Sequence, residues 1–353
     1  VKTLRAAGYS NSCKVAAKKL CGMRLFATHL GPSKELGPLQ EKMRGWLEIV
    51  SRPLQTYYND NADVRALGGL ELLRHASLDG TRRQDADGLV PSLAHPDAQK
   101  NTFWNNRIEG REDGERVMIH VYRILAKLLT PRFDALGAAA VNHAAAGNAN
   151  VRSNCVFRNP GCKGVARMLN KMKASDDHRY LERPRPAANI DILRAAVAVP
   201  TPQALAAAAQ FVSSHASVAG VSRIKNGLGL DSEAAARQYH YRAVLVNFPF
   251  APPGLTYGSL LGEELATRVL RDYRAKPDTD TQPWARWQND VSRAIAHLRS
   301  DPLRDVQVAM ICEMQFMLTR YLEGRKQSHL PYKVVRADDQ LALWQDFRKD
   351  RGR

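Results

Sequence analysis

The sequence predicts an α+β fold in which helices flank a mixed β-sheet. From Val306 to Phe316 the apolar residues occupy every second position, which is the period of a strand with one buried face. Two apolar strand-like runs, 189–199 and 218–224, flank a helical segment, so residues 190–224 form one strand–helix–strand pattern. That helix is expected to begin at Thr201-Pro202, because Thr caps helix starts and Pro suits the first helical position. Together these patterns predict a βαβ-type unit and a further strand in one sheet.

Residues 1–110 are expected to form a helical and partly irregular N-terminal region. Leu36–Val50 carries apolar residues at helical spacing, and Lys2–Leu25 is basic and Ala-rich. Residues 58–110 are rich in turn-forming sequences, with a short helix around Gly69–His75.

Residues 111–353 are expected to form a second domain, with a core at 155–250 and 306–337. Two helices, Glu115–Leu129 and Asp134–Ala146, lead into it. The first is predicted to turn four polar residues to solvent: Arg116, His120, Arg123 and Lys127. The remaining elements are a helix over Gly161–Lys173, a strand over Tyr241–Phe250, a short helix over Leu318–Gln327 and a basic tail at 338–353.

Residues 251–305 are predicted to be a helical insertion between two strands. Its helices are expected at Ser259–Tyr273 and Pro283–Arg299. Such a pair must pack on the edge of the domain or dock a protein partner.

The composition is strongly basic. The chain has 52 Lys and Arg against 35 Asp and Glu, a formal net charge of +17. A surplus of this size favours polyanionic partners, such as RNA, a ribosome or nucleotide phosphates. No run of 18 apolar residues predicts a membrane span.

The five cysteines are odd in number and lack CxxC spacing. This favours reduced thiols in an intracellular compartment, either the cytoplasm or, after loss of a transit peptide, a mitochondrion or plastid. Half of a zinc site at Cys155 and Cys162 remains an alternative.

Polar residues in the predicted strands suggest a catalytic or binding site. Glu313 and Gln315 share the polar face of their strand, about 7 Å apart, and Asp191 lies at the start of another. Two neighbouring carboxylates bind a hard cation such as Mg²⁺, or divide into a metal ligand and a base. Six basic residues are available to bind phosphates: Lys163, Arg167, Lys171, Arg223, Lys225 and Arg242. No P-loop, GxGxxG or HExxH motif competes with this interpretation.

Four segments in order resemble the RelA/SpoT-like domain, in a divergent branch found in protists: NIDILRAAV, VSRIKNG, YRAVLVNF and ICEMQFML with KQSHLPYKVVRA. The resemblance covers about residues 155–337 and implies a nucleotidyltransferase-type mixed sheet. Bacterial members transfer pyrophosphate from ATP to the 3′ hydroxyl of GDP or GTP and make guanosine tetraphosphate or pentaphosphate.

The resemblance also implies roles for individual residues. Asp191 would hold Mg²⁺, Glu313 would be a second metal ligand or the catalytic base, and Gln315 would orient it. The cations Lys163, Arg167, Lys171 and Lys225 would face the ATP phosphates, with Arg194 close to Asp191. The acceptor side would contain Tyr241, whose ring would stack on guanine, together with Asn247, His329 and Tyr332.

Two other functions stay open. Where the family has Gly before the tyrosine, this chain has His240, and no Arg-Thr follows Glu-x-Gln. These differences allow another acceptor, such as an RNA end. The net charge also suits a non-catalytic RNA-binding or organellar ribosome-associated protein that keeps the fold as a scaffold.

Overall fold

The computed structural model describes residues 36–73, 76–77, 112–173, 178–180, 185–275, 283–335 and 337. Its contacts divide the chain into two compact units. The smaller unit combines residues 1–60, 233–241 and 323–353, and the larger one combines residues 61–232 and 242–322. The N-terminal helix predicted at 2–25 and the C-terminal tail at 338–353 lie outside the described residues.

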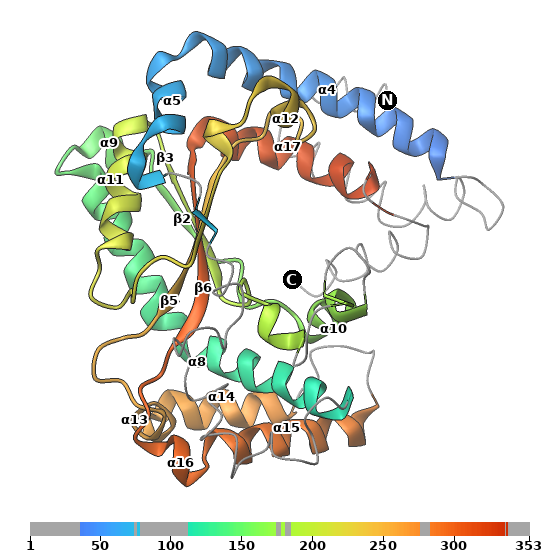
Figure 1. Ribbon diagram of the computed structural model, residues 1–353, viewed down its shortest axis with the longest axis vertical. Helices are drawn as coiled ribbons and strands as arrows, with labels where there is room; N and C mark the ends of the chain where they lie inside the picture. The colour runs from blue at the N-terminus through green and yellow to red at the C-terminus, as the bar shows by residue number, and fades with distance from the viewer. Residues whose placement is uncertain are drawn as a thin grey trace. The chain divides into compact units, whose positions relative to one another are not determined.

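The larger unit contains a mixed sheet of six strands in the order β1-β4-β5-β6-β3-β2 (Figure 1). The strands are β1 (Ala76–Ser77), β2 (Val156–Arg158), β3 (Arg194–Val199), β4 (Arg223–Asn226), β5 (Val244–Phe250) and β6 (Met310–Leu318). β3 and β6 pair in parallel, and every other neighbouring pair is antiparallel. The predicted mixed sheet with flanking helices is therefore confirmed.

The predicted strand–helix–strand unit is present, but its two strands are not adjacent in the sheet. Helix α11 (Pro202–Ser213) follows β3, and its N-cap Thr201 accepts a hydrogen bond from the amide of Ala204, as the sequence predicted. The second strand begins later than expected, at Arg223. Because β5 and β6 lie between β3 and β4, the two strands of the unit are not neighbours in the sheet.

Helix α8 (Glu112–Ala145) is the central helix of this unit. The prediction of two helices at 115–129 and 134–146 was wrong, because one helix continues through Pro131. His120 and Arg123 were predicted to face solvent and are instead buried. Helical spacing reveals one apolar stripe, whereas later segments of the chain cover the other side of α8 as well.

The insertion covers much of that second side. It contains α13 (Tyr257–Gly262), α14 (Glu264–Ala275), α15 (Trp284–Leu298) and α16 (Asp301–Arg304). Helices α14 and α15 pack on α8. Tyr273 and Trp287 are buried there beside His120, whose Nδ1 lies 3.0 Å from the Tyr273 hydroxyl. The apolar faces of the insertion are thus used within the unit.

Several shorter elements complete the larger unit. They are α5 (Ala62–Ala66), α9 (Ala149–Ser153), α10 (Val165–Lys173) and four 3₁₀ turns at 67–69, 71–73, 185–188 and 227–229. The helix predicted over 161–173 thus begins four residues later than expected, at Val165. The turns at 67–69 and 71–73 stand where a short helix was expected.

The smaller unit contains α4 (Gly37–Asp60), most of α12 (Ser232–Ala236) and most of α17 (Thr319–Val335). The side-chain amide of Gln40 donates to the carbonyls of Val334, Val335 and Ala337, and so caps the end of α17. The helix predicted at 318–327 is longer than expected, and His329 and Tyr332 lie within it. None of the helices in the described part of the chain is long and apolar enough to cross a membrane.

Candidate functional site

A row of four polar residues crosses the sheet of the larger unit. Arg194 of β3 pairs with Glu313 of β6, Glu313 with Asn247 of β5, and Asn247 with Arg223 of β4. Residues opposite each other on paired strands point to the same face. Two positions along, a second row contains Ala196, Gln315, Leu245 and Lys225. The strand register therefore gathers six predicted site residues, Arg194, Glu313, Asn247, Arg223, Gln315 and Lys225, on one face.

This polar face is the more accessible one. On the other face, Phe157 of β2 pairs with Val197, and its ring lies against Gly137 of α8. Arg194 has the opposite parity to Val197, so the polar rows face away from α8. Lys225 is exposed, and Arg194, Arg223 and Gln315 are half-buried.

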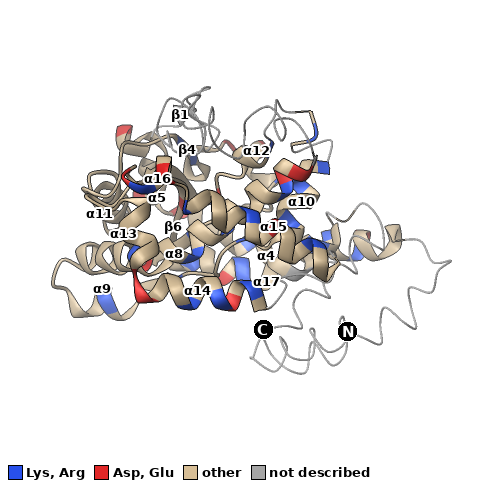
Figure 2. Cartoon of the chain, turned by 90° about the horizontal axis from the view of Figure 1, so that it is seen from below, with Lys and Arg blue, Asp and Glu red and all other residues tan. Residues whose placement is uncertain are grey.

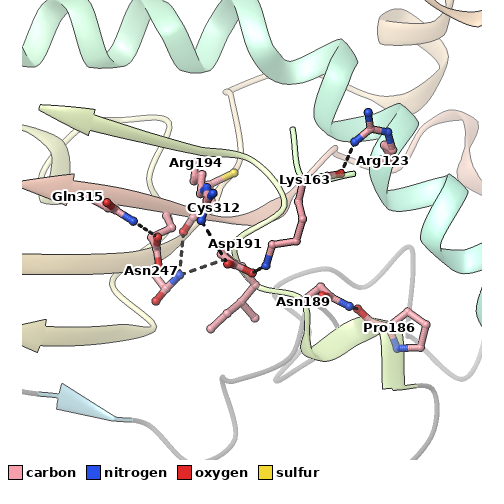
Figure 3. Close-up of polar contacts among 11 residues, drawn as sticks. Arg123, Lys163, Pro186, Asn189, Asp191, Arg194, Asn247, Cys312 and Gln315 are labelled. Carbon is pink, nitrogen blue, oxygen red and sulfur yellow. Dashed lines mark hydrogen bonds and ion pairs between the residues drawn. The ribbon is translucent and has the colours of Figure 1, made fainter. Parts of the chain in front are cut away.

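Asp191 lies just before β3 and forms an ion pair with Lys163 (Figure 3). The Lys163 side chain is 1% exposed and the Asp191 side chain 18%. The second oxygen of Asp191, Oδ2, lies 3.9 Å from a guanidinium nitrogen of Arg194. Both carboxylate oxygens of Asp191 thus face cations of the protein itself.

These charges shift both pKa values. Burial would raise the pKa of Asp191, but the positive charges of Lys163, Lys171 and Arg194 outweigh it and lower this pKa to about 2. Burial lowers the pKa of Lys163 to about 8, against the opposing effect of Asp191. At neutral pH the pair is therefore a carboxylate and an ammonium.

The backbone of Lys163 is fixed next to Asp191. Its amide donates to the carbonyl of Ile192 over 2.9 Å. Arg123 of α8 donates to the carbonyl of Lys163 and, over 3.2 Å, to that of Cys162. Sequence patterns missed this role of Arg123, because a single Arg on an amphipathic helix gives no sign that a later loop covers it.

Glu313 and Gln315 contact each other directly. The side-chain amide of Gln315 donates to a carboxylate oxygen of Glu313 over 2.6 Å. Glu313 is 4% exposed. The predicted common orientation of the two side chains is therefore confirmed, and the site carboxylate is more enclosed than a surface residue.

Asn247 links the segments that carry the two carboxylates. Its amide nitrogen lies 3.2 Å from the carbonyl of Ile190 and 3.5 Å from that of Cys312, the residues before Asp191 and Glu313. Its amide oxygen accepts a hydrogen bond from Nε of Arg223 over 3.0 Å. Asn247 is 0% exposed, so its amide serves these internal contacts.

The expected basic stripe is only partly helical. Lys163 precedes α10, whereas Arg167 and Lys171 lie on it one turn apart. Lys171 is half-buried and close enough to lower the pKa of Asp191. Arg167 is exposed.

Arg242 is placed differently from the other candidate cations. It is 2% exposed, and its guanidinium donates to the carbonyls of Gly227, Leu228 and Leu230 over 2.9, 3.4 and 2.8 Å. These contacts hold the turn that follows β4.

Tyr241, His329 and Tyr332 belong to the smaller unit and are described there. The hydroxyl of Tyr241 accepts a hydrogen bond from Arg325 over 3.3 Å, and the guanidinium of Arg325 lies 5.6 Å from the centre of the same ring. Tyr332 is 41% exposed and meets Tyr239 edge to face. His329 is exposed.

Two carboxylates, Asp191 and Glu313, are the candidates for holding a metal ion at this site. Within the described residues no three His, Cys, Asp or Glu side chains form a metal-binding group. Cys155 and Cys162 therefore belong to no such group in the described part of the chain. Mg²⁺ does not need such a cage, because it usually takes one or two carboxylates and completes its shell with water and substrate phosphates. The ionised Asp191 fits that mode as one ligand, and Glu313 lies on β6, the strand paired with the one that Asp191 precedes.

Comparisons of the chain with models of protein families, with curated proteins and with solved structures found no match.

Proposed function

We propose that the polar face of the sheet carries a Mg²⁺-dependent enzyme site of RelA/SpoT type. It would transfer pyrophosphate from ATP to a ribose hydroxyl of GDP, GTP or another acceptor. The observation that carries this proposal is the cross-strand row Arg194–Glu313–Asn247–Arg223 with Asp191 beside it. It combines carboxylates with cations on the accessible side of a sheet. Phosphoryl transfer uses such groups to bind the metal ion and to stabilise the charge on the phosphates.

Each end of the row has a separate task in this proposal. Asp191 would hold Mg²⁺, which would neutralise charge on the phosphates. Lys163, Lys171 and Arg194 would bind the phosphates of ATP. Arg223 and Lys225 lie on β4, three strands from Arg194 on β3 at about 4.8 Å per strand. Because of that separation we assign Lys225 to anionic groups of the second substrate, together with Arg223, and not to the ATP phosphates that the resemblance implies.

Glu313 would act on the acceptor as its base. The hydroxyl proton passes to the carboxylate while the hydroxyl oxygen bonds to the β-phosphorus of ATP. The bond from that phosphorus to the α-phosphate oxygen breaks, and AMP leaves. Gln315, bonded to Glu313, would hold the carboxylate in place.

The experiment is a product assay. Purified protein, ATP labelled in its terminal phosphate, Mg²⁺ and either GDP or GTP should yield AMP and a labelled acceptor, separated by anion exchange. Glu313→Gln keeps an oxygen that accepts from Gln315 and should lower the rate by about 10²–10⁴-fold, the usual contribution of a general base. An unlabelled acceptor in every mixture, with RNA oligonucleotides included, would reject the proposal.

A second candidate function rests on charge. Basic residues lie on several helices of the larger unit, among them Arg152 of α9, Lys173 of α10 and Arg268 of α14 (Figure 2). With the net charge of +17, this favours a non-catalytic RNA-binding or ribosome-associated protein. Its RNA affinity should fall steeply between 50 and 200 mM salt, as expected for phosphate contacts. RNA binding that is absent or insensitive to salt would reject this candidate.

A further inference from the structure

The ion pair between Lys163 and Asp191 occupies the position that the proposed function assigns to a metal ion. Asp191 is the carboxylate expected to ligate Mg²⁺, and one of its oxygens already accepts from the ammonium of Lys163. Figure 3 shows the two side chains pointing toward each other from separate segments.

We propose that Lys163 is a latch on this site, which competes with divalent cations for Asp191 and releases it only to a metal–polyphosphate complex. The inference rests on the proposed function and adds to it the way in which metal ion and polyphosphate bind to the site. Metal and polyphosphate would enter together, and neither would bind well alone.

The burial of Lys163 is the first reason. Its side chain is 1% exposed, and its backbone is fixed by Ile192 and Arg123, so the ammonium cannot withdraw into water when a metal takes Asp191. A buried charge that loses its partner is strongly unfavourable. A metal ion alone would create that situation and add a second positive charge beside it.

The exchange of partners is the second reason. When a metal–polyphosphate complex binds, the metal replaces Lys163 at Asp191, and a phosphate oxygen replaces Asp191 at Lys163. Every charge keeps a partner of opposite sign. Lysine suits this exchange, because its ammonium is a point charge on a flexible stem and can pair with a carboxylate or a phosphate. Lys171 and Arg194 add positive charge for the incoming phosphates.

Equilibrium dialysis of Mn²⁺ against the purified full chain tests the latch without any catalysis. Wild-type protein should retain little Mn²⁺ alone, and should retain it about 100-fold more tightly with inorganic triphosphate, the factor that an unpaired buried charge implies. Lys163→Met, which keeps the length of the side chain but removes its charge, should bind Mn²⁺ alone about 100-fold more tightly than wild type.

Three variants complete the design. Lys163→Gln should behave like Lys163→Met, and it replaces that variant if Lys163→Met does not fold by circular dichroism. Adding Asp191→Asn to either should abolish the gained Mn²⁺ binding, which assigns it to this carboxylate. Lys173→Met changes an exposed lysine at the end of α10 and should leave Mn²⁺ binding as in wild type.

The outcomes separate the latch from the proposed function. If wild type binds Mn²⁺ alone as tightly as both Lys163 variants do, the latch is refuted while the metal site stands. The same holds if wild type binds Mn²⁺ only with triphosphate and neither variant gains affinity for Mn²⁺ alone. If no form of the protein binds Mn²⁺ even with triphosphate, the latch and the proposed function are refuted together.

Discussion

Arg242→Met is expected to lower the free energy of unfolding by about 3–6 kcal/mol, because it removes a buried guanidinium that holds a turn. Arg242 is 2% exposed and donates to the carbonyls of Gly227 and Leu230 over 2.9 and 2.8 Å. A hydrogen bond from a charged donor contributes about 1.5–3 kcal/mol, so the two shorter bonds set that range. The third bond, to Leu228 at 3.4 Å, adds little.

Urea denaturation followed by circular dichroism measures this loss. Arg237→Met is the matched control, since Arg237 pairs with Glu233 on the surface at 64% and 85% exposure. The control should change stability by less than about 1 kcal/mol. If Arg242→Met unfolds at the wild-type urea midpoint but loses triphosphate binding, the side chain serves a ligand, and the assignment of Arg242 to the turn is wrong.

Two further predictions concern stability. Burial lowers the pKa of His120 to about 3 and that of His297 to about 4, so the unfolded chain takes up these protons at higher pH than the folded chain. The free energy of unfolding should therefore decrease below pH 6.5, by about 2 kcal/mol per histidine at pH 5. In urea denaturation at pH 5 and pH 8, His120→Gln should remove half of this difference. An unchanged difference between the two pH values would contradict the argument. Gly258→Ala should destabilise, because its methyl group would lie 2.8 Å from the carbonyl oxygen of Arg304, whereas Gly45→Ala meets nothing within 4 Å and should stabilise α4 by about 0.5–1 kcal/mol. A melting temperature that rises for Gly258→Ala as it does for Gly45→Ala would show that helix propensity outweighs the close approach.

Local patterns predicted the parts of the structure that depend on neighbouring residues. The alternation that ends at Phe316 placed Glu313 and Gln315 on one side of β6, because the orientation of strand side chains repeats every two residues. Thr201 was a correct helix start because its cap bond reaches only three residues along the chain. Boundaries were less accurate, and the strand expected from residue 189 begins at Arg194.

Contacts between distant segments were not predictable in this way. No periodicity indicated that the insertion would bury His120, or that Arg123 would bond to the carbonyl of Lys163 forty residues later. Asn247 looked like a ligand-binding residue, yet it lies in the sheet and bonds to the carbonyls of Ile190 and Cys312.

The sequence by itself determined an α+β chain with a strongly basic net charge and a polar pair on an apolar strand. Only the tertiary structure decided that β5 and β6 lie between β3 and β4, and that Asp191 meets Lys163. The physical reason is range. Strand alternation and helix caps arise from the geometry of a few consecutive residues, whereas strand order and ion pairing depend on which distant segments bury each other.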